Sequence, residues 1–253
     1  MPPVLTSARK NYRLSWLISR RAVREARKVR NKGNMAVAGV VAAHQITQAQ
    51  ASQAAVADML AEQEIDAIAD AILNLASFTT TAADLDRMLA EITTDGQFDR
   101  LVESIVTDAA RAAESVAVAV RPHIYHVRYV NPPCCARCAI LAGRVYKWST
   151  GFERHPGCDC SMIPTTIASQ YRQNPDELVR SGQVRGLSKA DMQALADGAD
   201  LGRVVNVRSK KAGLLEAGHA LTRGGRPTPA GIYRIASDRE HAIELLKRYG
   251  YIR

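Results

Sequence analysis

Aromatic residues are scarce in this sequence, and long apolar runs are missing. Only 5% of the 253 residues are Phe, Trp or Tyr, whereas 47% are hydrophobic, so the apolar part is largely Ala, Val, Leu and Ile. This composition suits closely packed helices and argues against an aromatic-rich β-sandwich. No stretch approaches the roughly 20 apolar residues that span a bilayer. The first residues also lack a secretion signal, so we expect synthesis and first use in the cytoplasm.

Catalytic templates are missing as well. The only glycine-rich candidate, Gly224-Gly225-Arg226, follows no strand signal and lacks the Lys-Ser/Thr ending of a phosphate loop. There is no G-x-S-x-G elbow. His123 and His126 lie on one predicted strand, where we expect half-buried structural residues and not a catalytic pair. We therefore do not expect an enzyme.

Charge is distributed unevenly along the chain, whose formal net charge is +9. Residues 1–34 carry ten basic and one acidic side chain (+9), residues 35–120 three and thirteen (−10), and residues 121–253 twenty-one and eleven (+10). Two explanations are open. Either the acidic segment contacts a basic neighbour, or the basic ends reach toward a polyanion.

Helical patterns dominate the first half. A basic amphipathic helix is expected from Ser7 to about Asn31. Its apolar stripe either packs on its own protein, or it serves to dock on a partner groove, nucleic acid or an anionic membrane surface. Further helices are expected over residues 36–77, as one helix or two, from the cap Thr81 with Asp84 to about Ile92, and from about Asp95 to Val120.

The second half alternates short elements. Residues 123–130 are rich in β-branched and aromatic side chains and predict a strand, and residues 203–207 predict a second. Short helices are expected after the caps Ser188 and Thr228, the latter followed by proline. A last helix, capped by Ser237, should run through Arg248.

All five cysteines fall between residues 134 and 160, and this clustering favours a metal over a disulfide framework. A CxxC pair is followed, after a loop, by HPGCDC. The candidate ligands are Cys135, Cys138, His155, Cys158 and Cys160. We favour Cys135, Cys138 and Cys160, with His155 or Cys158 as the fourth ligand, because zinc in structural sites takes four such ligands. The adjacent Cys134 is the weakest candidate.

Alternatives to a structural zinc are a reduced, buried cysteine cluster or a CxxC redox pair. A redox pair would leave the additional CxC unexplained. A catalytic zinc needs an open ligand position and a nearby base, and the deaminase pattern with Glu two residues after His155 is absent. With four protein ligands the site would be closed, so we expect the Zn²⁺ to be structural.

The same residues resemble a known family. A strand followed by PPCCARCAILAGRVY and HPGCDCSMIP is similar to the core of the minor head proteins of tailed bacteriophages, the head-morphogenesis family typified by the F protein of phage Mu. The matching positions are Cys135, Cys138, Leu141, Gly143, Tyr146, His155, Pro156, Cys158, Cys160 and Pro164. The resemblance is specific over residues 121–252, where the segments LSKADMQALADGADLGRVVNVRS and TPAGIYRIASDREHAIELLKRYGYI also fit such proteins of actinobacterial phages. Cys134 and the loop between the ligand pairs depart from the pattern.

What the resemblance implies is a structural minor capsid protein of the virion, made in the host cytoplasm. Its expected partners are the portal protein and the scaffold or major capsid protein. Packaged double-stranded DNA is a further candidate partner, and no membrane is involved in the assembled head. The alternatives are a nucleic-acid-binding zinc protein and a capsid maturation protease or other metallohydrolase, and the sequence offers no protease constellation.

The expected fold class is α+β and predominantly α-helical. Long N-terminal helices should precede a small zinc-stapled α+β module and short C-terminal helices. Four segments follow from the composition: a basic helical arm (1–34), an acidic Ala-rich helical region (35–120), a strand with the Cys/His module (121–165) and a C-terminal α+β region (166–253).

Overall fold

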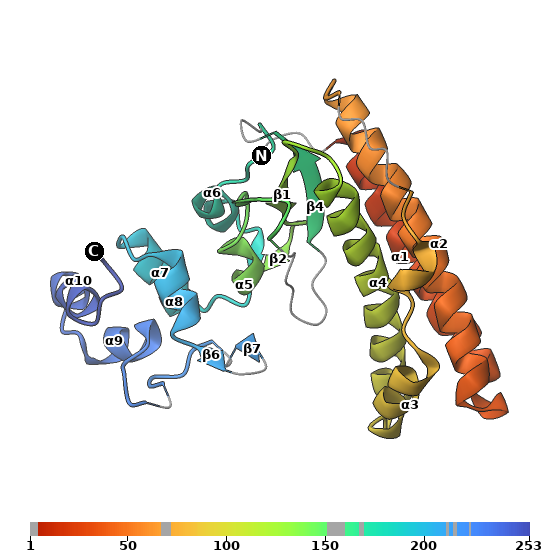
Figure 1. Cartoon of the computed structure of the whole chain (residues 1–253). Helices are drawn as coiled ribbons and strands as arrows, with labels where there is room; N and C mark the ends of the chain where they lie inside the picture. Colours follow the sequence, from red (N-terminus) through yellow and green to blue (C-terminus); the bar gives the residue numbers. More distant parts are fainter. Residues whose placement is uncertain are drawn as a thin grey trace. The chain divides into compact units, whose positions relative to one another are not determined.

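The computed structural model of the chain is a mostly helical α+β structure, as expected (Figure 1). It describes residues 5–66, 72–150, 160–166, 170–210, 213–214, 217–222 and 224–253. Two compact units are present. The helical unit comprises Pro2–Tyr129 and Val145–Arg172, and the C-terminal unit comprises Val130–Arg144 and Gln173–Arg253. No helix within the described ranges has the length and apolar character needed to cross a membrane.

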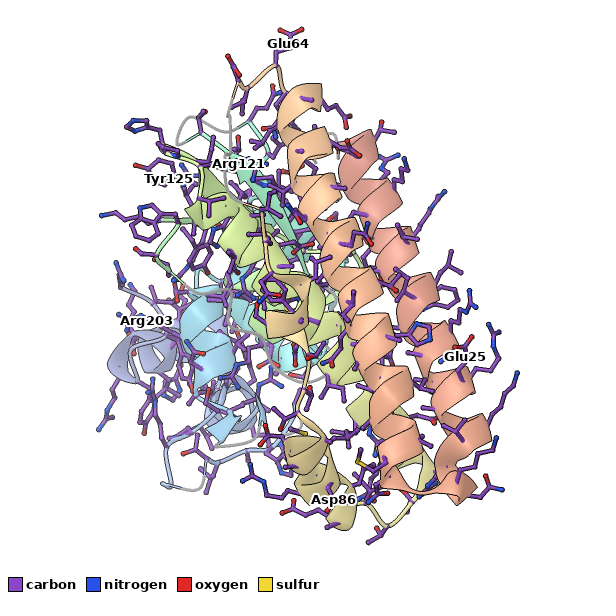
Figure 2. All side chains as sticks on the ribbon, turned by 45° about the vertical axis from the view of Figure 1, so that its right-hand side comes forward. Glu25, Glu64, Asp86, Arg121, Tyr125 and Arg203 are labelled. Atoms are coloured by element: carbon purple, nitrogen blue, oxygen red, sulfur yellow. The ribbon has the colours of Figure 1, made fainter. Side chains whose placement is uncertain are left out.

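Four α-helices and two short 3₁₀ helices build most of the helical unit. They are α1 (Thr6–Val29), η1 (Arg30–Lys32), α2 (Asn34–Glu62), η2 (Leu75–Phe78), α3 (Ala82–Ala90) and α4 (Asp95–Ala119). The prediction of α-helix over residues 36–77 is wrong for residues 63–66 and 72–74, and residues 67–71 lie outside the described residues. There Glu64, at the end of α2 in Figure 2, takes a positive φ of 57° that a right-handed helix does not allow.

Side-chain caps define the starts of α3 and α4. The Thr81 hydroxyl accepts the Asp84 N–H at 3.1 Å, which confirms the predicted cap. Thr94 and Gln97 form a reciprocal capping box at the start of α4. This box was not predicted from the sequence, although its spacing is the same as that of Thr81 and Asp84.

Helices α1, α2 and α4 pack side by side (Figure 1). Side-chain contacts join α1, and η1 at its end, to α4: Arg30 of η1 contacts Asp95, and in α1 Arg27 contacts Asp99, Ser19 contacts Thr107 and Asn11 contacts Glu114. Along these contacts the α1 residue numbers fall as the α4 numbers rise, so the two helices run antiparallel. The core between the helices contains Ile18, Ala22, Val23, Ala26, Val37, Val41, Leu85, Phe98, Val102 and Val106.

The start of α1 is capped from another helix. Leu5 precedes α1 and offers no side-chain acceptor. Instead the Glu62 carboxylate, at the end of α2, accepts the Thr6 N–H at 2.7 Å and the Ser7 N–H at 2.8 Å. Hydrogen bonds from Ser7 lower the pKa of Glu62, which keeps this acceptor charged. Two of the four unsatisfied N–H groups of α1 are thereby satisfied.

A small antiparallel sheet completes the helical unit. It has the order β3 (Val145–Tyr146), β1 (Tyr125–Tyr129) and β4 (Ser161–Thr165). Strand β1 confirms the predicted strand, shortened because His123 has a positive φ of 66°. Strand β4 lies against the helices, and the Gln63 amide donates to the Pro164 carbonyl at 2.8 Å.

The C-terminal unit consists of short helices and strand pairs. It contains β2 (Cys134–Cys135), α5 (Ala136–Ala139), α6 (Pro175–Arg180), β5 (Val184–Arg185), α7 (Lys189–Ala196), α8 (Leu201–Asn206), β6 (Ser209–Lys210), β7 (Gly213–Leu214), α9 (Pro229–Ile235) and α10 (Arg239–Arg248). One core cluster of this unit contains Ala194, Ala199, Val204, Ile232, Ala242, Leu245, Leu246 and Tyr251. The predicted caps Ser188 and Thr228 are both confirmed.

Two local predictions for the C-terminal unit are wrong. Residues 203–207 were expected as a strand but belong largely to α8, because the Asp200 carboxylate accepts the Arg203 N–H at 2.9 Å and caps a helix there. The last helix is capped by Asp238 and not by Ser237. The Asp238 carboxylate accepts the His241 N–H at 2.8 Å.

A buried carboxyl group lies inside the helix bundle. Glu114 of α4 is 7% exposed, and its Oε1 accepts a hydrogen bond from the Asn11 amide of α1 at 2.9 Å. Burial raises the pKa of Glu114, while the charge of Arg111 and the polar groups of Asn11 and Ser52 oppose that shift. Burial therefore penalises the charged carboxylate more than the uncharged acid.

Replacing Glu114 by Gln should raise the free energy of unfolding near pH 7 and leave it almost unchanged near pH 4. A raised pKa in the folded state means that the contribution of Glu114 to the free energy of unfolding falls as the pH rises above the ordinary glutamate pKa. Gln keeps the Oε1 acceptor for Asn11 and has no proton to lose. Urea unfolding of both proteins across this pH range measures the difference. Parallel pH profiles would contradict the prediction.

Candidate functional site

The five predicted zinc ligands fall in three places. Cys135 and Cys138 belong to the C-terminal unit, Cys160 belongs to the helical unit, and His155 and Cys158 lie outside the described residues. None of the described cysteines forms a disulfide. Among the residues that the structure describes, no three or more His, Cys, Asp or Glu side chains gather as a metal-binding group.

Cys135 and Cys138 form a tight turn at the start of α5. Cys135 is the N-cap of this helix, and its Sγ accepts the Cys138 N–H at 3.3 Å. Cys138 is buried one helical turn later. Hydrogen bonds from N–H groups favour the thiolate form of a cysteine, which is the form that binds zinc. The pair therefore fits as two ligands of one ion, and we call it the cysteine knuckle.

Neighbouring backbone holds the cysteine knuckle in place. Strand β2, which contains Cys134 and Cys135, pairs in parallel with β5. Successive residues of a strand point to opposite faces, so Cys134 and Cys135 cannot both face one ion without distortion. Cys134 is fully buried. The alternation therefore leaves room for one of these two cysteines, and not both, in a single site.

Gly143, a position of the resemblance motif, lies just after the cysteine knuckle in a turn. Its φ is +69°, and a Cβ atom there would lie 2.2 Å from the Gln173 carbonyl oxygen. The Gln173 side chain in turn binds Val130 twice, accepting its N–H at 2.7 Å and donating to its carbonyl at 3.0 Å. Gly143 thus lets the segment after the knuckle approach the backbone before α6.

In the helical unit, Cys160 directly precedes β4 and is buried. Its carbonyl accepts a hydrogen bond from Arg111 of α4 at 3.1 Å. His126 of β1 is also buried, contrary to the expected half-buried position, and stacks on the Tyr146 ring at 5.2 Å between centroids. Burial and the charge of Arg128 lower the pKa of His126 to about 4, so this imidazole is neutral near pH 7. His123 is exposed on the preceding turn.

A second candidate site is the solvent-exposed side of α1. We call it the outer face of α1 and define it by Lys10, Arg13, Trp16, Leu17, Arg20, Arg24 and Lys28. Most of these residues recur every three or four positions, which places them along one side of the helix. Trp16 is 53% exposed and Leu17 is 56% exposed, and the Arg20 guanidinium lies 5.8 Å from the Trp16 ring centroid.

The apolar stripe predicted for this helix is therefore divided. Ile18, Val23 and Ala26 pack in the core of the helical unit, as expected if the helix packs on its own protein. Leu14 and Leu17 are exposed instead. The helix consequently has an inner apolar side and an outer side that combines cations with apolar side chains.

The acidic side chain of the N-terminal segment does not neutralise the outer face. Glu25 lies on the flank of α1 (Figure 2), where it accepts Arg21 Nε at 2.7 Å and contacts His44 Nε2 of α2 at 2.9 Å. Hydrogen bonds from Arg21 and His44 lower the pKa of Glu25 to about 2. Arg27 and Arg30 pair with acids of α4. The cations of the outer face form no ion pair with any residue in the described ranges.

Searches with the chain found no matching family model, no similar curated protein and no similar solved structure.

Gly143→Ala should destabilise the C-terminal unit more than Gly182→Ala does. Both glycines have a φ of +69°, but a Cβ atom at Gly182 meets nothing within 4 Å. Gly182→Ala should cost about 1–2 kcal/mol through backbone strain alone. Gly143→Ala should cost about 1–3 kcal/mol more, because it also overpacks against Gln173. Denaturant unfolding compares the two, and equal losses would show that the close approach to Gln173 is unimportant.

Proposed function

We propose that this chain is a structural head protein of a tailed bacteriophage that acts with the portal and with the scaffold or major capsid protein. The observation that carries the proposal is the cysteine knuckle followed by the Gly143 turn, because these residues combine the motif of the resembling family with a local geometry suited to zinc. The outer face of α1 supports a binding role.

In this proposal zinc is structural. Cys135 and Cys138 supply two thiolates, and the remaining ligands come from Cys160 with His155 or Cys158, as the sequence spacing predicts. Four protein ligands leave no open position for water, so the bound ion would hold chain segments together and would not activate a nucleophile.

The outer face of α1 is the proposed contact for acidic partners, packaged double-stranded DNA among them. Five cations lie on this face, and none of them is neutralised by an ion pair with a described residue. The residues that define this face include five cations and one aromatic side chain, Trp16. Attraction to DNA should therefore be largely electrostatic and independent of base sequence. The alternative function, a nucleic-acid-binding zinc protein outside the phage head, shares this prediction.

Cys135→Ser is expected to abolish stoichiometric zinc binding and to prevent incorporation of the chain into phage heads. Replacing one of four ligands removes most of the binding free energy that supports a structural zinc site. Cys134→Ser is the matched control, since it makes the same chemical change one residue away and should keep both properties. Metal analysis of the purified variants and quantitative mass spectrometry of proheads and heads give the two readouts.

Several results would contradict this prediction. If metal analysis finds no zinc in the wild-type protein, the proposed structural role of zinc is wrong. Equal zinc content in both variants would remove Cys135 from the ligand set. Absence of the wild-type chain from both proheads and heads would remove the head function, even where zinc is bound, and would leave the nucleic-acid-binding alternative.

Changing Arg13, Arg20 and Arg24 together to Glu should weaken binding to double-stranded DNA and reduce its salt dependence. Each lost phosphate contact lowers the slope of log affinity against log salt by about 0.9, so three lost contacts should lower it by about 3. Fluorescence anisotropy with a DNA duplex at several salt concentrations measures the slope.

The control carries the same charge change on exposed residues of the C-terminal unit: Arg185, Arg234 and Lys247 to Glu. If net charge alone governs the affinity, both triple variants will lose it equally, and the assignment of the outer face of α1 will be wrong. Unchanged circular dichroism should accompany both variants, because all six residues are exposed.

A further inference from the structure

An arginine-lined cleft of about 940 Å³ lies within the C-terminal unit. Its walls come from the end of α5, the start of α6, the link between α7 and α8, and the last residues of the chain. This volume lies in the range of ligand pockets in proteins. We call it the arginine cleft after Arg144, Arg203, Arg226 and Arg253, which line it from four separate stretches of sequence.

Two of these arginines are held in place by the end of α10. Arg203 of α8, labelled in Figure 2, donates from Nη1 to the Gly250 carbonyl at 2.5 Å. Arg226 donates to the Tyr249 carbonyl, and its guanidinium lies 4.8 Å from the Tyr251 ring centroid. The carbonyls at the end of a helix lack N–H partners within the helix, so they are natural acceptors for these groups.

The anchoring leaves hydrogen-bonding capacity on both side chains. A guanidinium has five N–H donors, and each of these arginines uses one of them in the described bonds. Arg144 is exposed and makes no side-chain hydrogen bond or ion pair with a described residue. The cleft therefore offers N–H donors from two anchored side chains, Arg203 and Arg226, and from one that is not anchored, Arg144.

Acidic groups do not balance the arginines. Asp176 and Asp200 are the acidic side chains of the cleft, against four arginines. Asp200 is occupied in part as the cap of α8, where it accepts the Arg203 N–H. The side chains of the cleft thus carry an excess of two positive charges. A cluster of this kind is favourable for an anion with several oxygen acceptors.

We propose that the arginine cleft binds a small organic phosphate, with its phosphate groups on the arginines and its carbon-bearing part against the cleft's apolar side chains. Guanidinium groups match phosphate oxygens in bidentate geometry. Ile140, Leu201 and Val207 supply apolar surface to the same cleft. The small residues Gly198, Ala199 and Gly202 also line it, which keeps side chains from filling the space beside the arginines. The inference is independent of the proposed head function, because it uses neither the cysteine knuckle nor α1.

The test is titration of the full chain with ADP and with inorganic pyrophosphate by isothermal calorimetry at low salt. We expect saturable binding of both, tighter for ADP. Arg144→Ala should weaken both affinities by about tenfold, the usual loss for one charged hydrogen bond. Arg203→Lys keeps the charge but loses the planar fork, and it should also weaken binding. Arg185→Ala, an exposed arginine of β5 outside the cleft, should bind as the wild type does.

The remaining outcomes overturn the proposal. No saturable binding of either probe would show that the cleft takes no phosphate ligand. Equal weakening by Arg185→Ala would indicate attraction by net charge and no site. A DNA duplex that displaces ADP, with Arg144→Ala reducing DNA affinity as much as ADP affinity, would assign the cleft to backbone phosphate of nucleic acid. Arg144 is exposed, so we expect the Arg144→Ala variant to fold. Thermal unfolding of the variant checks this.

Discussion

The close packing of α1 against α2 and α4 determines which side chains of the helical unit can meet a partner. The inward positions of α1 include Ala8, Ala22 and Ala26, all nearly or fully buried. Such small residues let helix backbones approach closely, and together with Ile18 and Val23 they fill the inner side of α1. Trp16, Leu17 and the unpaired cations are consequently displayed on the outer face. The periodicity of α1 thus places its packing residues on one side and its exposed cations on the other.

The uneven charge of the sequence has two structural explanations, and each accounts for part of it. Arg27 and Arg30 of the basic segment do pair with acids of α4, as the first explanation requires. The outer face of α1 keeps its charge, as the second requires. In the C-terminal unit, four arginines line one cleft. The positions of the unpaired cations therefore indicate where anions can bind, which the formal net charge does not.

Local sequence signals predicted local structure, and long-range packing could not be predicted from them. The caps Thr81, Ser188 and Thr228 were identified because cap and helix lie within three residues. Residues 203–207 were predicted as a strand because of their β-branched composition, whereas the Asp200 cap begins a helix there. The cysteine knuckle follows from its CxxC spacing. The burial of Glu114 and the convergence of four arginines depend on segments far apart in sequence, and no signal in any one segment reports them.

The cap that Glu62 provides for α1 also bears on the order in which the chain folds. A helix with its own capping residues, such as α4, has the means to begin its first turn as soon as that segment exists. Helix α1 receives its cap from a residue more than fifty positions later. During synthesis from the N-terminus, the cap of its first turn becomes available only after the whole of α2 has emerged. The most basic helix of the chain is thus completed only together with its neighbour, which couples the formation of its cationic surface to the assembly of the bundle.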